Sequence, residues 1–111
     1  MKQKPRRIPK PWRGNKSAFK AVDKIYSEYG KALRAVSDKV GSEYVVRDGA
    51  HLKELFEVRA QAEGKLGELK DNLAHPERHS ANVLETSTEG ASDLEELLTD
   101  MDAHGIQKGT A

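Results

Sequence analysis

The sequence predicts a small all-α protein: an antiparallel helical hairpin with an extended basic N-terminal arm and a short C-terminal acidic amphipathic helix. Two patterns predict this fold class. Apolar residues recur every three or four positions in two long runs, and the charge changes from basic to acidic along the chain. Because 36% of the 111 residues are hydrophobic and 33% are charged, we expect one domain with a small core.

The first apolar run predicts the first helix of the hairpin, which as a whole occupies residues 17–75. Its apolar residues alternate between spacings of three and four, so they share one face of a helix. Ser17 is the predicted N-cap, and Gly41 with Ser42 ends the helix. The predicted hairpin-packing residues of this helix are Phe19, Val22, Tyr26, Tyr29, Leu33, Val36 and Val40.

A second run with the same spacing predicts the second helix, which begins after a turn at Asp48 and Gly49, with Asp48 as the N-cap. Residues 43–46, the one β-like run, are predicted to be a packed loop. Pro76 ends the second helix, because a residue before proline disfavours the α conformation. Two helices cover each other on one side only, so we expect self-association or a protein partner. The predicted packing residues here are Leu52, Leu55, Leu66, Leu69 and Leu73.

Arg59 occupies a position of the second run that apolar residues fill elsewhere. Its sequence context leaves three interpretations open. The side chain lies at the edge of the helix face with its head in water, or it is buried in an ion pair with a carboxylate such as Asp23 or Glu28. In the third interpretation it contacts an outside partner.

Residues 1–16 are predicted to form a basic, proline-rich arm. The first 20 residues hold eight Lys and Arg and no acid, which gives a net charge of +8. Pro5, Pro9 and Pro11 favour an extended path, along which cations contact nucleic-acid phosphates or an acidic partner with little sequence specificity. The alternative is a tail that only aids solubility. The predicted contact residues are Lys2, Lys4, Arg6, Arg7, Lys10, Trp12, Arg13 and Lys16.

Residues 76–111 are acidic, with a net charge of −6. Residues 76–91 are predicted to be a linker, residues 92–105 a short acidic amphipathic helix, and residues 106–111 a tail. The short helix either closes the open face of its own hairpin or docks in a partner's groove, and its acids would shield a basic arm, its own or a neighbour's. The predicted docking residues are Leu94, Leu97, Leu98 and Met101.

No pattern indicates a catalytic residue, a cofactor or a metal site, so we expect a non-enzymatic protein. The chain has no cysteine, and its nine glycines form no phosphate-binding motif. His75 and His79 have the i, i+4 spacing of metal ligands without a zinc-site motif, and are interpreted as solvated helix-end residues. No stretch is apolar enough for a transmembrane segment or a Sec signal peptide.

These features favour an accessory or structural subunit of a larger assembly, a virion or other nucleoprotein particle, that docks through its hairpin and is tethered by its charged ends. The alternative is a small nucleic-acid-binding regulator that dimerises through the hairpin and contacts phosphates with residues 1–20. Peripheral membrane attachment through the cations and Trp12 is a third interpretation. We expect a location inside the cell or within a particle, without Sec export.

Overall fold

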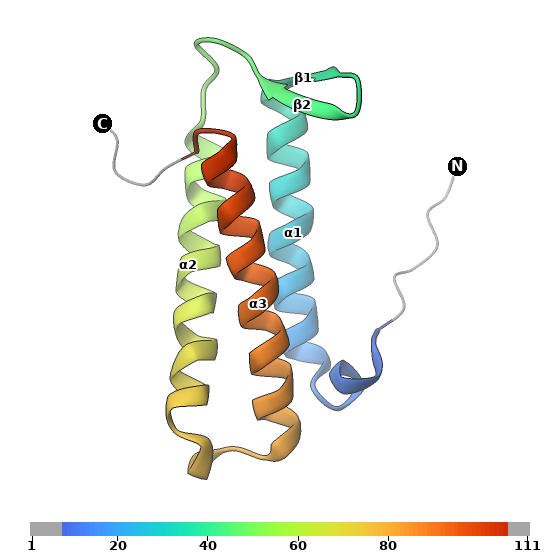
Figure 1. Ribbon diagram of the computed structural model, residues 1–111, viewed down its shortest axis with the longest axis vertical. Coiled ribbons are helices and arrows are strands. Elements are labelled where there is room, and N and C mark those ends of the chain that lie inside the picture. The colour runs from blue at the N-terminus through green and yellow to red at the C-terminus, as the bar shows by residue number, and fades with distance from the viewer. Residues whose placement is uncertain (1–7, 107–111) are drawn as a thin grey trace.

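The computed structural model describes residues 8–106 and shows a mostly helical protein (Figure 1). Its long helices are α1 (Lys16–Val36), α2 (Lys53–Ala74) and α3 (Ala81–Ala103). Helices α1 and α2 run in opposite directions, and α3 packs against both (Figure 1). The predictions for residues 1–7 and 107–111, including those for Lys2, Lys4, Arg6 and Arg7, lie outside the described residues.

A small antiparallel sheet connects α1 to α2, so the strict all-α prediction is wrong. Its strands are β1 (Ser37–Val40) and β2 (Glu43–Val46). Helix α1 therefore ends four residues before the predicted end, and the predicted packed loop is a strand. Gly41 has a φ of 64°, which favours glycine and lets the chain turn back so that the two strands pair. Val40 points away from the core, with 62% of its surface exposed.

Arg47 joins this sheet to the end of α1. Its Nε donates to the Asp38 carboxylate at 3.0 Å, and its two other guanidinium nitrogens donate to the carbonyl oxygens of Ala35 and Ser37 at 3.2 and 3.3 Å. Carbonyls at the end of a helix lack partners within the helix, and a cation there is favourable. Arg47 therefore stabilises the change from helix to strand after Val36. The apolar spacing of α1 does not indicate this change.

The predicted N-caps are also wrong. Ser17 lies inside α1, which begins after Asn15, and Asp48 lies in a turn well before α2. Neither helix has a side-chain hydrogen bond at its N-cap. In contrast, α2 ends at Ala74, in agreement with the prediction from Pro76.

Helix α3 replaces the predicted linker and short helix. Residues 81–91 form its first half, and residues 92–103 continue it without a break. The side chain of Ser80 caps its start by accepting the Val83 N–H at 3.2 Å. A short 3-10 helix, η2 (Pro76–Arg78), connects α2 to α3.

The linker prediction is wrong because the small polar residues of this segment are buried between helices. Thr86 and Ser87 are each 1% exposed. Thr86 Oγ1 donates to the Asn82 carbonyl at 3.0 Å and accepts from Asn15 Nδ2 at 2.9 Å, while Ser87 Oγ accepts from Asn72 Nδ2 at 3.2 Å. Buried hydroxyls with partners cost little, so this polar stretch packs as a helix.

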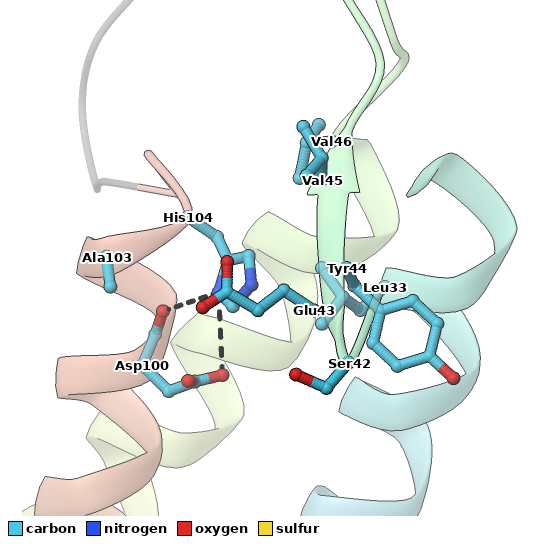
Figure 2. A pocket seen from close by; sticks show the side chains of 9 residues that line it. All are labelled: Leu33, Ser42, Glu43, Tyr44, Val45, Val46, Asp100, Ala103 and His104. Atoms are coloured by element: carbon cyan, nitrogen blue, oxygen red, sulfur yellow. Dashed lines mark hydrogen bonds and ion pairs between the residues drawn. The ribbon is translucent and has the colours of Figure 1, made fainter. Parts of the chain in front are cut away.

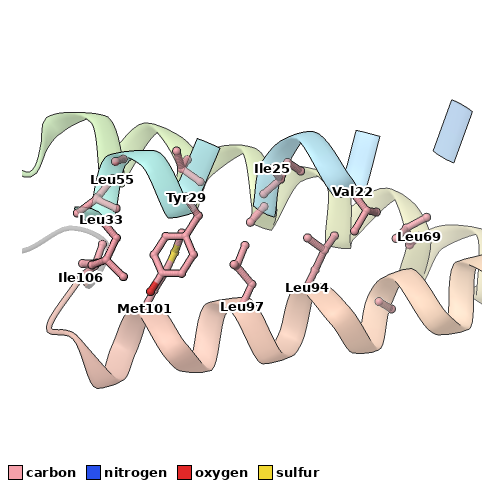
Figure 3. Close-up of a cluster of buried hydrophobic side chains, with 14 of the residues drawn as sticks. Val22, Ile25, Tyr29, Leu33, Leu55, Leu69, Leu94, Leu97, Met101 and Ile106 are labelled. Atoms are coloured by element: carbon pink, nitrogen blue, oxygen red, sulfur yellow. The ribbon is translucent and has the colours of Figure 1, made fainter. Parts of the chain in front are cut away.

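One apolar cluster fills the space between the three helices (Figure 3). Helix α3 contributes the fully buried Leu94, Leu97 and Met101, and Ile106 follows it. The predicted packing residues that are buried in this cluster are Val22, Tyr29, Leu33, Leu55 and Leu69. Those that are partly buried against it are Phe19, Tyr26, Val36, Leu52 and Leu66. Val40 and Leu73 are not part of the cluster, whereas Val58, outside the predicted stripe, is buried.

Part of the predicted extended arm folds into a 3-10 helix, η1 (Lys10–Gly14). Within it, Trp12 is 3% exposed and meets Phe19 edge-on, with the ring centroids 5.8 Å apart. A Cβ at Gly90 would lie 3.1 Å from Trp12 Cη2, so this glycine permits the close approach of the indole to α3. Trp12 is therefore a core residue, and the prediction that it contacts a partner is wrong, because the indole buries a large apolar area against α3.

Leu94→Ala is expected to lower the free energy of unfolding by about 2–5 kcal/mol, because it leaves a cavity at a fully buried position. Leu98→Ala, on the same helix at a half-buried position, is the matched control and is expected to cost less. Urea unfolding followed by circular dichroism measures both. Equal, small losses for the two variants would contradict the packing of α3.

Trp12→Ala is expected to lower the free energy of unfolding by about 3–5 kcal/mol, since the indole is part of the core. Arg13→Ala, at the exposed neighbouring residue, is expected to change it by no more than about 0.5 kcal/mol. Thermal unfolding compares them. An unchanged midpoint for Trp12→Ala would show that the indole is not buried.

Candidate nucleic-acid interface

Exposed cations line η1 and the first half of α1. We call the set of Lys10, Arg13, Lys16, Lys20 and Lys24 the basic surface; all five side chains are exposed. In α1, Lys16, Lys20 and Lys24 follow one another at intervals of four residues, so they share one side of the helix. Within residues 8–106, the only ion pair of the set is the one between Lys24 and Glu28, with Nζ 4.0 Å from the carboxylate. Four of the five charges therefore face solvent without a counter-charge.

This surface contains three of the predicted contact residues, Lys10, Arg13 and Lys16. Lys20 belongs to the basic residues 1–20 that were predicted to contact phosphates, and Lys24 extends the surface beyond them. The regular spacing of the lysines was the signal that could have identified the extension. Residues 1–7, which precede the basic surface, contain four further Lys and Arg and no acid.

The predicted docking face of the C-terminal helix is not available to a partner. Leu94, Leu97 and Met101 lie in the core between the helices, and Leu98 is half-buried against it. Of the two alternatives for this helix, the structure shows the one in which it covers the open face of its own α1 and α2. The physical reason is that α1 and α2 leave an apolar surface that α3 covers.

Arg59 of α2 binds to the C-terminal end of α3. Its guanidinium donates to the Asp102 carboxylate and to the Ile106 carbonyl, both at 2.7 Å. An ion pair within the chain is therefore the correct interpretation, but the partner is on α3 and is neither Asp23 nor Glu28. This pair fixes the C-terminal end of α3 to α2.

A second polar cluster joins α1 to the same end of α3. The Tyr29 hydroxyl donates to the Asp100 carboxylate, and His104 Nδ1 lies 3.4 Å from that hydroxyl and 2.8 Å from the Asp100 carbonyl oxygen. Burial raises the pKa of Tyr29 well above its ordinary value, and the hydrogen bond and charge of Asp100 raise it further. The phenol therefore stays protonated and acts as a hydrogen-bond donor. The sequence analysis gave His104 no role.

The outer side of this cluster borders an open hollow of about 680 Å³ between β2 and the end of α3 (Figure 2). Glu43 of β2 and Asp100 of α3 line it, and Figure 2 shows His104, a further lining residue, joined to Asp100 by dashed lines. The hollow thus has an acidic rim and an apolar side formed by Leu33 and Val46.

A groove follows the line between α1 and α3, and we call it the α1–α3 groove. It consists of a hollow of about 240 Å³ beside η1 and an adjoining one of about 740 Å³ towards the sheet, which share Tyr26 and Glu96. Its acidic lining residues are Asp23, Asp93, Glu95, Glu96 and Asp100. The described residues that line the groove include no Lys or Arg.

The histidines predicted to lie at a helix end do so. His75 lies 3.8 Å from Asp71 and 3.7 Å from Glu77. In the described part of the chain, no three His, Asp or Glu side chains are grouped so that they could hold a metal ion. None of the helices within residues 8–106 has the length and apolar character needed to cross a membrane.

Comparisons of the chain with protein-family models, with curated proteins and with solved structures give no match.

Tyr29→Phe is expected to lower the free energy of unfolding by about 1–3 kcal/mol at neutral pH, because it removes a hydrogen bond to a carboxylate. The pKa of Tyr29 is higher in the folded chain than in the unfolded chain, so this stabilisation is complete below about pH 10 and is lost as the pH rises further. The difference between the two proteins should therefore shrink above that pH.

Chemical unfolding at a series of pH values measures this difference. Tyr44→Phe, at a half-buried tyrosine of β2, is the control and should change stability little. A Tyr29→Phe variant as stable as the parent chain at neutral pH would contradict the role assigned to this hydroxyl.

Proposed function

We propose that this chain is a non-enzymatic accessory subunit of a larger nucleoprotein assembly, such as a virion, and that it contacts nucleic-acid phosphates. The contact would use the basic surface together with residues 1–7. One observation carries the proposal: four of the five cations of the basic surface have no ion-pair partner among the described residues. Such cations release counterions from nucleic acid on binding, which favours association.

The expected contact is with the backbone and carries little sequence specificity. Lysine and arginine side chains on an exposed helix face bind phosphates, while reading of bases requires side chains that enter a groove and meet base edges. Trp12 is buried in the core and so does not supply a stacking platform for a base. The proposal therefore relies on charge alone.

The mode of docking differs from the one that the sequence favoured. The apolar faces of α1 and α2 are covered by α3, so the helical hairpin has no open apolar stripe with which to dock. Tethering through the basic N-terminal end remains part of the proposal, whereas the acidic C-terminal segment packs as α3 of the chain's own core. A protein partner or a second copy would bind at another surface, and we propose a location inside the cell or within a particle.

The alternative function is a small nucleic-acid-binding regulator that dimerises through the hairpin. It shares the phosphate contact but needs an apolar dimer surface. The exposed large apolar residues among those described are Val40, Val45 and Phe56, which lie on the sheet and on α2. Three residues make a smaller patch than a stable dimer needs, so the subunit is favoured.

A triple variant is expected to bind duplex DNA and RNA of any sequence more weakly than the parent chain. It combines Arg13→Gln, Lys16→Gln and Lys20→Gln. Loss of three phosphate contacts lowers the slope of log affinity against log salt concentration by roughly 2 to 3. Fluorescence anisotropy at a series of salt concentrations measures this slope.

The matched control combines Lys31→Gln, Lys39→Gln and Lys53→Gln, which removes the same charge from three exposed lysines outside the basic surface. This variant is expected to keep most of the salt slope of the parent chain. Equal losses for the two triple variants, or no measurable binding by the parent chain at low salt, would refute the phosphate contact.

A further inference from the structure

We infer that the α1–α3 groove is a docking surface for the chain's own basic residues 1–7. The inference goes beyond the proposed function, because the groove and its occupant are both parts of this chain and no nucleic acid is needed for the contact. It is based on the shape and lining of the groove, on the balance of charge between the two segments, and on the place where residues 1–7 join the fold.

The groove has an aromatic floor with acids along its sides. Tyr26 and Tyr29 form part of the floor, and their hydroxyls donate to the Asp93 carbonyl and the Asp100 carboxylate, which fixes both rings. Glu96 lies where the two hollows meet, is exposed, and makes no hydrogen bond or ion pair with any other described residue. Arginine and lysine side chains bind the acids of such a lining through charge-assisted hydrogen bonds.

The charge of the folded part complements that of residues 1–7. Residues 8–106 contain 18 acids and 14 Lys and Arg, an excess of four negative charges. Residues 1–7 contain four Lys and Arg and no acid. The α1–α3 groove brings five of the acids together. Glu95 pairs with Lys70 at 3.6 Å and Asp100 accepts from Tyr29, whereas Glu96 has no partner among the described residues, so the groove is a surface that attracts a basic segment.

Residues 1–7 precede η1, whose Trp12 lines the groove. Trp12 and Phe19 line the hollow beside η1, and Ile8 packs against the core cluster. An extended segment of seven residues spans at most about 25 Å, whereas the stretch of α3 that lines the groove, from Ser92 to Ala103, is about 16 Å long. The segment is therefore long enough to follow the groove from end to end.

The same chain, and not a second copy, is the expected source of the occupant. A short tether holds a segment near its site at an effective concentration in the millimolar range, and a second copy competes only near that concentration. One consequence rests on the proposed function: phosphates of nucleic acid would compete with the groove for the same four cations.

The absence of cysteine allows a direct test in the full chain. A nitroxide spin label on Gln3→Cys keeps all the charges of residues 1–7 and broadens the amide NMR signals of nearby residues. At about 50 mM salt we expect broadening at residues 92–99 and at Tyr26. At about 1 M salt, where exposed charges are screened beyond roughly 3 Å, this broadening should be lost.

A charge reversal locates the contact. Glu96→Lys in the labelled chain is expected to lower the docked fraction roughly two- to fivefold, the size of effect typical of an exposed ion pair. Glu89→Lys makes the same change at an exposed residue of α3 outside the groove lining and should leave the broadening unchanged. Equal effects of the two variants would overturn the assignment to the groove.

Two further results would also overturn the inference. One is a lack of broadening along the groove at low salt. The other is equal broadening when a labelled chain is mixed with an unlabelled, isotope-enriched chain, since that pattern shows exchange between copies. The samples contain no nucleic acid, so these outcomes do not bear on the proposed phosphate contact. The salt-dependence experiment tests that contact separately.

Discussion

The burial of the apolar side of α3 against α1 and α2 is the interaction on which the other features of this protein depend. Two helices alone would leave their apolar residues half-covered, and Leu94, Leu97 and Met101 complete the core with side chains that are at most 2% exposed. Because these residues face inward, the acids of α3 must face outward. The acidic lining of the α1–α3 groove is therefore a direct consequence of how the core is closed.

Two polar connections keep α3 in this orientation at its C-terminal end. Arg59 of α2 binds Asp102, and Tyr29 of α1 binds Asp100, so each neighbouring helix holds one carboxylate of the last turns of α3. At the other end, Trp12 packs against Gly90 and anchors η1. This anchor holds η1, which carries Lys10 and Arg13, at the end of the groove that Trp12 lines.

The sequence predicted the elements whose stability depends on their own periodicity, and it failed where stability depends on a distant partner. The regular spacing from Phe19 to Val36 and from Leu55 to Leu69 located two helices. The strand at residues 37–40 depends on pairing with residues 43–46, and the helix at residues 81–91 depends on small residues that fit against other helices. Polar, glycine-containing stretches of this kind have the composition of a linker until their packing partners are known.

The candidate interface was predictable in its chemistry but not in its geometry. The run of cations without acids was evident from the sequence, whereas the burial of Trp12 depends on contacts with α3 that no local pattern encodes. Amide hydrogen exchange of residues 81–91 tests the central claim most directly, because the account requires this segment to be helical and packed. We predict slow exchange there, comparable to that of residues 94–101, and exchange at the rate of an unstructured chain would contradict the account.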